Sequence, residues 1–474
     1  MSFTSAVPAP GWAATQGRIL AIAWPVMLSN ITVPLLGLVD SAILGHLPDA
    51  AYLGAVSIGA QLFTLLCWSF GFLRMGTTAL TARSRSTAEQ TGVLGHAFWL
   101  ALPLSAIIGC CGWLLLPQVI PWMGATQAVS DGAQLYLSIR VISVPAVFAQ
   151  YALLGWFIGR GQTRVPLIIM TVTNLANGGL DALFVYGMDM TTDGVALGSV
   201  IADYLGLVTG LWFVWRQQSG VEALADQHCL IHKVLQRWHR RPSWQQLQPM
   251  IRINRQLFVR TLTLLLVFAF FNAQGARQGE LILAANSLMI TLLLLISNAL
   301  DGIAHAAESL TGQVLAQTGQ TAHQRRSRDA IERLSVNVQR IVIITGVNSL
   351  TLAILLSLTF TAAGNWLWPL FTNNPALLPL LDEYQIWLIG LPLVGFWSYW
   401  LDGLCIGAGA ASTMRNAMLT AALLVFMPLW WLTSELGNTG LWLSFYAFLL
   451  ARAVFVMRFT LQLYREPVSF APEH

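Results

Sequence analysis

The sequence predicts an all-α polytopic membrane protein, in which twelve transmembrane helices form two six-helix, pseudo-symmetric bundles. Three observations predict this fold class. The composition is 56% hydrophobic and only 10% charged, whereas a soluble globular domain carries about 25% charged residues. Long apolar stretches recur along the whole chain, and the two halves of the chain resemble each other.

Each predicted span is an apolar stretch of roughly 20 residues or more, the length that a helix needs to cross a hydrocarbon core about 30 Å thick. The spans are residues 18–44, 52–76, 93–116, 134–158, 165–187, 194–215, 256–276, 281–306, 341–363, 380–406, 414–434 and 438–458. The predicted domains are a cytoplasmic N-terminus (1–17), an N-terminal six-helix lobe (18–216), a cytoplasmic linker (217–253), a C-terminal six-helix lobe (254–460) and a cytoplasmic tail (461–474).

The basic residues predict the orientation in the membrane. When the loops are assigned alternately to two sides, 20 Lys and Arg residues fall on the side of the N-terminus and only Arg277 falls on the other side. Cytoplasmic loops carry such an excess of basic residues. We therefore expect a multi-pass protein with both termini in the cytoplasm.

Matching segments indicate an internal duplication. Residues 53–83 align with residues 283–313, Pro145–Gly161 aligns with Pro392–Gly409 with one residue inserted, and the segment from Gly194 matches the segment from Gly440. Because each half holds six spans, both halves have the same topology. Repeats of this kind form secondary transporters, in which one half rocks against the other.

Several function classes have no motif in this sequence. The only lysine, Lys233, is not part of a Walker A motif, and neither HExxH nor GxSxG occurs. The five cysteines lack metal-binding or CxxC spacing. We therefore expect no enzyme activity, no cofactor, no ATP and no nucleic acid as a partner. The basic linker is interpreted as positive-inside charge or as a contact with anionic membrane lipids.

Asp40 lies near the outer end of the first predicted span. An ionised carboxylate is costly there, on the order of 2.5–3.5 kcal/mol at the centre of a span, and such residues tend to be functional. The alternative is an aspartate that reaches interfacial water or caps a neighbouring helix. Pro25 and Pro34 in the same span permit a bend next to Asp40 or a static kink.

Three more polar residues are predicted at the depth of Asp40. Asp181 lies in the outer half of the fifth span, with Asn177 one turn away on the same helix face. Ser199 lies near the outer end of the sixth span, and Asp203 follows it by one turn as an additional candidate. These oxygen donors suit a proton or a hard cation such as Na⁺ and not a soft transition metal. Two carboxylates in a low dielectric favour sharing a proton or a cation.

The C-terminal half also carries polar residues within its spans. Asp301, His305 and Glu308 share one face of the eighth span, and Asp402 lies in the tenth. Both a structural polar network and a role in transport are compatible with this pattern. Asp301 and Glu308 are therefore additional candidates for the site.

Two motifs resemble a known family. With six plus six spans, SNITVPLLGLVDSAILGHL in the first span and LDGIAHAAESLTGQ in the eighth resemble the multidrug and toxic compound extrusion (MATE) family, especially its DNA-damage-inducible F (DinF) branch. The resemblance extends from about residue 17 to residue 460. It implies a proton- or Na⁺-coupled exporter of cationic and amphipathic compounds, with two lobes that form a V-shaped cavity.

The resemblance also implies roles for individual residues. The family's first-span aspartate and its fifth-span Asn-x-x-x-Asp, which take part in cation coupling, correspond to Asp40, Asn177 and Asp181. The sixth-span hydroxyl, usually Thr, corresponds to Ser199, and the first-span proline near the bend corresponds to Pro25. The acidic residues that other branches use for Na⁺ in the C-terminal lobe have no residue-by-residue match.

These observations predict a multidrug antiporter of a bacterial cytoplasmic (inner) membrane that exports small organic cations or amphipathic drugs. Asp40 and Asp181 would alternate between the substrate and a coupling ion, either H⁺ or Na⁺. The main alternative is a lipid or lipid-linked oligosaccharide flippase of the same wider superfamily, which would need a hydrophilic, arginine-rich cavity. An intramembrane enzyme lacks any catalytic motif, and a passive channel does not need duplicated halves.

Overall fold

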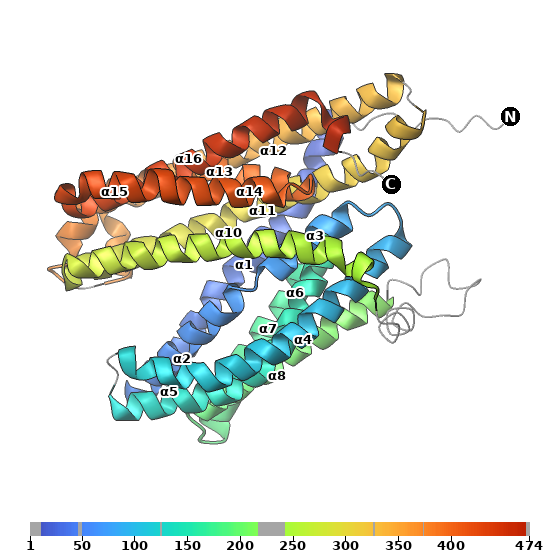
Figure 1. Ribbon diagram of the computed structural model, residues 1–474. Coiled ribbons are helices and arrows are strands. Elements are labelled where there is room, and N and C mark those ends of the chain that lie inside the picture. The colour runs from blue at the N-terminus through green and yellow to red at the C-terminus, as the bar shows by residue number, and fades with distance from the viewer. Residues whose placement is uncertain are drawn as a thin grey trace. The chain divides into compact units, whose positions relative to one another are not determined.

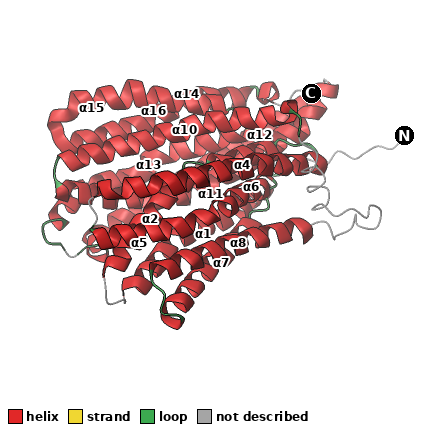
Figure 2. Cartoon of the chain, turned by 60° about the horizontal axis from the view of Figure 1, so that its bottom comes forward, coloured by secondary structure: helices red, strands yellow, loops and turns green. Residues whose placement is uncertain are grey.

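The computed structural model describes residues 11–45, 50–123, 126–216, 242–325, 328–372 and 374–470, without the side chains of residues 31–42, 44–45, 50, 122–123, 318–325, 328–330 and 365. The described residues form helices and turns and contain no strand (Figure 2). The predicted all-α class is therefore confirmed. Asp40 and Pro34 belong to the first helix, but their side chains are not among the described ones. The linker residues 217–241 lie outside the described residues.

Figure 1 shows the helices of the N-terminal half, from blue to green. They are α1 (Trp12–Gly45), α2 (Ala50–Trp68), α3 (Phe72–Ala82), α4 (Thr87–Val119), α5 (Gln127–Arg140), α6 (Val144–Gly159), α7 (Arg164–Ala182) and α8 (Thr192–Arg216). A 3₁₀ turn joins α5 to α6, and Pro145 stands in the first turn of α6, where a missing backbone N–H costs no helical hydrogen bond. The predicted fourth span is therefore two helices in line.

The C-terminal half repeats this pattern of long helices. They are α10 (Trp244–Arg277), α11 (Glu280–Arg325), α12 (Arg328–Ala363), α13 (Leu378–Gly407), α14 (Ala411–Ala421), α15 (Met427–Thr433) and α16 (Gly437–Arg465). Among the described residues, ten segments are long and apolar enough to cross a membrane. One of them, Ala411–Arg465, covers the last two predicted spans, and α1 covers the first. The helices are thus consistent with the predicted count of twelve.

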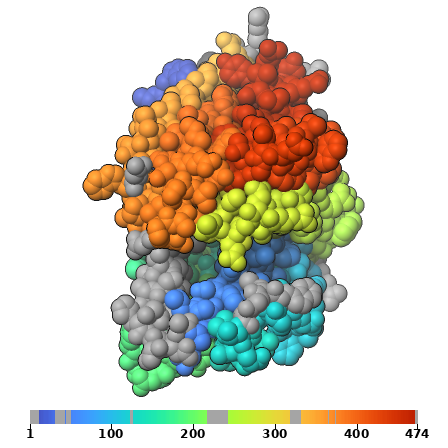
Figure 3. Space-filling view, turned by 90° about the vertical axis from the view of Figure 1, so that its left-hand side faces the viewer, coloured from blue at the N-terminus to red at the C-terminus, as the bar shows by residue number. Residues whose placement is uncertain are grey.

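The chain divides into two compact units. Unit 1 holds residues 1–27, 82–85 and 255–474, and unit 2 holds residues 28–81 and 86–254. In unit 2, α8 packs against α5, α6 and α7, and in unit 1, α11 packs against α12 and α13. The C-terminal segments of unit 1, orange to red in Figure 3, form one continuous block of side chains. The predicted lobes differ from these units, because they assign the whole first span to the N-terminal half.

The first half of α1 belongs to unit 1 because of its apolar contacts. Ile19 and Ile22 are buried in a cluster with residues of α11 and α12. Gly302 of α11 permits this approach, since a Cβ at that position would lie 2.1 Å from Met27 Cγ. Arg83, in the α3–α4 loop, also belongs to unit 1: it donates hydrogen bonds to the carbonyl oxygens of Ala408, at 2.6 Å, and Phe470, at 3.5 Å. Burial lowers the pKa of its guanidinium.

The internal duplication is visible in the way two matching helices end. Gly161 after α6 and Gly409 after α13 have φ angles of 72° and 75°, a conformation that favours glycine. After each helix, two backbone N–H groups donate hydrogen bonds to carbonyl oxygens near the end of the helix. After α6, Gly161 donates to Ile158 and Gln162 to Phe157; after α13, Gly409 donates to Ile406 and Ala410 to Cys405. The two glycines that the predicted duplication aligns therefore share one backbone geometry.

A buried amide pair ties α11 to α16 in unit 1. Asn286 and Asn438 exchange two hydrogen bonds, at 2.7 and 3.1 Å, and Trp442 Nε1 donates to Asn286 Oδ1 at 2.9 Å. Asn286 is 0% and Asn438 3% exposed. In a bilayer, such groups have no water to bind instead, so this network fixes the packing of the two helices.

We expect Asn286→Ala to lower the melting temperature of the detergent-purified protein by several degrees. The substitution leaves the buried Asn438 amide and the Trp442 N–H without their partner, at a cost of about 1–3 kcal/mol for each buried unsatisfied group. Ser287→Ala is the control, because the Ser287 hydroxyl is exposed and bonds only within its own helix, to the Leu283 carbonyl. Equal melting temperatures for the two variants would contradict the structural role of the network.

Candidate cation site

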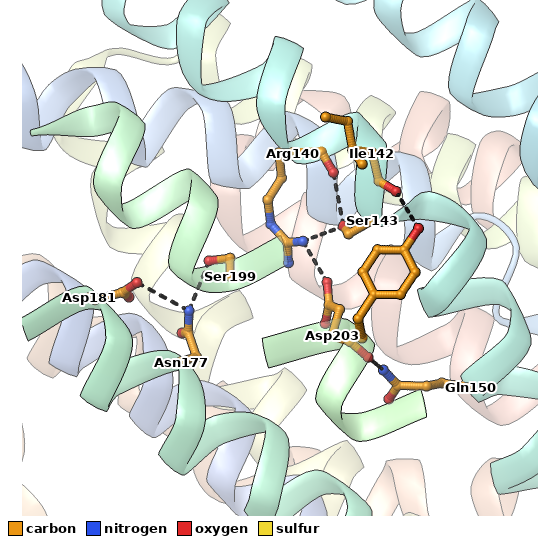
Figure 4. Close-up of polar contacts among 9 residues, drawn as sticks. Arg140, Ile142, Ser143, Gln150, Asn177, Asp181, Ser199 and Asp203 are labelled. Atoms are coloured by element: carbon orange, nitrogen blue, oxygen red, sulfur yellow. Dashed lines mark hydrogen bonds and ion pairs between the residues drawn. The ribbon is translucent and has the colours of Figure 1, made fainter. Parts of the chain in front are cut away.

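Three of the polar residues predicted to form one site lie together in unit 2 (Figure 4). Asn177 and Asp181 come from α7, and Ser199 comes from α8. Asn177 Nδ2 donates to Ser199 Oγ at 2.9 Å and to Asp181 Oδ1 at 3.4 Å. Asp181 is 0% exposed, Asn177 2% and Ser199 7%, so the cluster lies in the interior of the unit.

Local structure explains how α7 and α8 present these side chains. Asn177 and Asp181 are four residues apart and therefore occupy one face of α7. Directly after α7, the residues Leu183–Gly187 form a π-helical turn, a feature that often accompanies functional sites. Within this turn, the Tyr186 hydroxyl donates to the carbonyl of Ile43 in α1 at 3.1 Å. The C-terminal part of α1 is thereby held against the turn that follows α7.

Gly198 leaves room for the Asp181 carboxylate. A Cβ at position 198 would lie 2.2 Å from Asp181 Oδ1 and 3.3 Å from the Asp181 backbone nitrogen. Any larger residue would push the carboxylate or the whole of α7 away from α8. Gly198 is a functional candidate that the sequence analysis missed, because a glycine in an apolar helix gives no sign of what lies against it.

The cluster presents oxygen atoms that can bind a hard cation. Within the described part of the chain, Asn177 Oδ1 is buried and has no hydrogen-bond donor. It lies on the same side chain that contacts the carboxylate of Asp181 and the hydroxyl of Ser199. Carboxylate, amide and hydroxyl oxygens are ligands for hard cations. The described residues contain no group of three or more His, Cys, Asp or Glu side chains that could hold a metal ion.

Asp203, the additional candidate on α8, lies in a separate contact group (Figure 4). Its carboxylate forms an ion pair with Arg140 of α5 at 2.5 Å, and its backbone carbonyl accepts a hydrogen bond from Gln150 at 2.6 Å. Arg140 also contacts Ser143 and lies over the ring of Phe63, 4.1 Å from its centre. The carboxylate of Asp203 is thus already balanced by a fixed cation.

The polar residues of the C-terminal half lie in unit 1 and have partners there. Asp402 of α13 accepts hydrogen bonds from Arg260 at 2.7 Å and from Arg452 at 2.8 Å, both at Oδ2. On α11, His305 Nδ1 lies 2.9 Å from Glu308 Oε2, and both side chains are buried. Asp301, one turn before His305, is partly buried. The sequence indicated all three carboxylates as polar residues within spans, but it did not predict the two arginine partners of Asp402.

The duplication does not extend to the cluster itself. The matches on either side of this region, Gly161 with Gly409 and Gly194 with Gly440, place the counterparts of Asn177 and Asp181 within Leu423–Leu429. That segment reads LLVFMPL and contains no oxygen-bearing side chain. The position of Ser199 falls on Phe445, which is buried in the apolar core of unit 1. The oxygen-donor cluster is therefore a feature of one half only.

The helical fold, the duplicated halves and the buried polar groups together define a polytopic membrane transporter. The sequence profile of the MatE family matches residues 25–183. The chain is 35% identical over 440 residues to DNA damage-inducible protein F of Escherichia coli (strain K12), covering 91% of this chain and 89% of that protein.

Two solved structures share the fold. The Vibrio cholerae MATE transporter VcmN in its bent form has a TM-score of 0.80 at 17% identity, covering 97% of this chain and 99% of that chain. The MATE transporter ClbM in complex with Rb⁺ has a TM-score of 0.76 at 17% identity, covering 96% and 97%. The chain belongs to the MATE family of multidrug and toxic compound efflux transporters, and the predicted resemblance to DinF is confirmed.

Gly198→Ala should reduce drug resistance strongly in cells that depend on this protein for efflux. The added methyl group displaces the Asp181 carboxylate, which lies 2.2 Å from the position of the new Cβ. Gly179→Ala is the matched control on α7, because a Cβ there meets nothing within 4 Å. Resistance is compared at equal amounts of membrane-inserted protein. Equal resistance of the two variants would mean that the position of this carboxylate is unimportant.

Asp402→Asn should destabilise the protein in detergent, by on the order of 3 kcal/mol. Removing the carboxylate charge leaves Arg260 and Arg452 side by side without their shared counter-ion. Asp382→Asn is the control, since Asp382 is exposed near the start of the same helix. A melting temperature of the Asp402 variant equal to that of the control would show that the two ion pairs contribute nothing to stability.

Proposed function

We propose that this transporter is a secondary active antiporter that exports cationic or amphipathic compounds in exchange for H⁺ or Na⁺. Asp40, Asn177, Asp181 and Ser199 form the site where the coupling ion and the substrate exclude each other. The observation that carries the proposal is the Asp181 carboxylate, which is 0% exposed and shares a buried cluster with one amide and one hydroxyl.

The physical argument starts from the cost of burying a carboxylate in an apolar medium. A proton removes the charge, and a bound cation neutralises it; either event stabilises the cluster. A cationic substrate that approaches the same carboxylate competes for the negative charge. Binding of one ligand therefore favours release of the other, which is the requirement for exchange.

The contact between α1 and the π-helical turn after α7 supports the inclusion of Asp40. The Ile43 carbonyl, which receives the hydrogen bond from Tyr186, lies three residues after Asp40, or about one turn along α1. Tyr186 in turn lies five residues after Asp181. Both aspartates therefore belong to helix segments that meet at this hydrogen bond.

The donor set is compatible with Na⁺ as well as with a proton. The Asp181 carboxylate, Asn177 Oδ1 and Ser199 Oγ would hold the ion. ClbM, which shares the fold, was solved in complex with Rb⁺, so a protein with this architecture accommodates a monovalent cation. For this chain, both coupling ions remain part of the proposal.

The arginine pairs favour an antiporter over a lipid or lipid-linked oligosaccharide flippase. A flippase would need free arginines along its cavity to bind phosphate groups. Three of the four intramembrane arginines, Arg140, Arg260 and Arg452, are instead paired with Asp203 or Asp402. Paired guanidinium groups have less capacity to bind a second anion, because their charge is already compensated.

Asp40→Asn and Asp181→Asn should each abolish drug export while the protein stays inserted in the membrane. An amide has nearly the same shape as a carboxylate, but it does not take up a proton near neutral pH and carries no negative charge to attract a cation. The measurement is drug efflux from proteoliposomes under an imposed pH gradient and, separately, under a Na⁺ gradient. We expect one of the two gradients to drive drug efflux by the wild type. Both variants should lose at least 90% of this gradient-driven efflux, a tenfold reduction that corresponds to about 1.4 kcal/mol.

Asp131→Asn is the control, since this exposed carboxylate on α5 contacts Gln127 and is not part of the cluster. Wild-type efflux in either test variant would remove that residue from the exchange site. Efflux of the wild type without any ion gradient would contradict coupled antiport altogether.

A further inference from the structure

An open groove of about 620 Å³ lies along one face of α16 in unit 1. Its apolar part is lined by Trp397 of α13 and by Leu450, Ala453, Val454, Met457 and Leu461 of α16. Leu450, Val454 and Leu461 are 43%, 66% and 48% exposed. The volume is within the range of ligand sites in proteins, about 300–1,000 Å³. We call this feature the α16 groove.

The length of the α16 groove matches one leaflet of a membrane. Leu450 and Leu461 are eleven residues apart on α16, and a helix rises about 1.5 Å per residue, so the apolar part is about 17 Å long. Half of a hydrocarbon core about 30 Å thick is about 15 Å. With the orientation predicted from the basic residues, α16 ends in the cytoplasm, and the groove spans the cytoplasmic leaflet.

The cytoplasmic end of the α16 groove is positively charged. Arg458, Gln462 and Arg465 complete its lining, and all three are exposed. Arg458 and Arg465 are two turns apart on one helix face. Among the described residues, neither arginine takes part in an ion pair, whereas Arg452, two turns deeper, is bound to Asp402.

We propose that the α16 groove is a binding site for an anionic phospholipid of the cytoplasmic leaflet. One acyl chain occupies the apolar part beside Trp397 and Val454, and the phosphate group lies between Arg458 and Arg465. Gln462 supplies a neutral hydrogen-bond donor to the headgroup. Basic residues next to a membrane surface attract anionic lipids and distinguish them from zwitterionic ones, while the groove gives the acyl chain a defined position.

Charge argues against two other occupants of the α16 groove. A cationic drug would be repelled by the two arginines. A second copy of the chain, docked by two-fold symmetry, would bring the same arginines of both copies together. A phospholipid with a net negative charge complements both parts of the groove.

The proposal is tested by native mass spectrometry of the full-length protein released from detergent. The protein is incubated with equal amounts of phosphatidylglycerol and phosphatidylethanolamine that carry identical acyl chains. We expect phosphatidylglycerol to be retained preferentially by the wild type. The double variant Arg458→Gln/Arg465→Gln should lose this preference, with binding weakened roughly 25-fold, about fivefold for each arginine.

Two further variants separate this site from general attraction to a basic surface. Arg415→Gln removes a cytoplasmic arginine that contacts Asn416 outside the groove, and it should bind phosphatidylglycerol as the wild type does. Val454→Trp fills the apolar part of the groove, leaves both arginines in place, and should reduce retention of phosphatidylglycerol. Equal retention of the two lipids by the wild type, wild-type binding by the double variant, or an equal loss in the Arg415 variant would each overturn the proposal.

Discussion

The absence of water in the bilayer core governs the polar structure of this protein. A charged or hydrogen-bonding group within a span must find its partner in the protein. Asp203 is paired with Arg140, Asp402 is paired with two arginines, and His305 is paired with Glu308. Each pair joins groups that would be costly to bury alone, and the two arginine-bound carboxylates also tie separate helices together. The apolar helices supply the burial, and the polar pairs fix which helix faces meet.

This constraint separates two kinds of buried carboxylate. Asp203 and Asp402 have fixed counter-charges, so protonation of either would break an ion pair and destabilise its unit. Asp181 lies instead in a cluster with the amide of Asn177 and the hydroxyl of Ser199. The amide and the hydroxyl are neutral oxygen-bearing groups that can serve as ligands for a cation. These oxygen ligands support the proposal that the Asp181 cluster is the site of ion exchange.

The duplicated architecture is used asymmetrically. The two halves share their topology and even the backbone conformation at Gly161 and Gly409, yet the segment that matches Asn177–Asp181 is wholly apolar in the second half. The second half instead concentrates large aromatic side chains in its core, including Phe271, Trp442 and Phe445. A shared scaffold thus supports a polar cluster in one unit and aromatic packing in the other.

The sequence by itself predicted the all-α membrane fold, the family and a common depth for Asn177, Asp181 and Ser199, because hydropathy and helical periodicity are local properties of the chain. Only the tertiary structure decided which partner each buried charge has, since Arg140 and Asp203 are 63 residues apart and Arg260 and Asp402 are 142 apart. It also decided that α1 up to Met27 packs with the second half, and that Gly198 makes room for Asp181. Such contacts depend on which helix faces meet in space, and the spacing of residues along one helix does not contain that information.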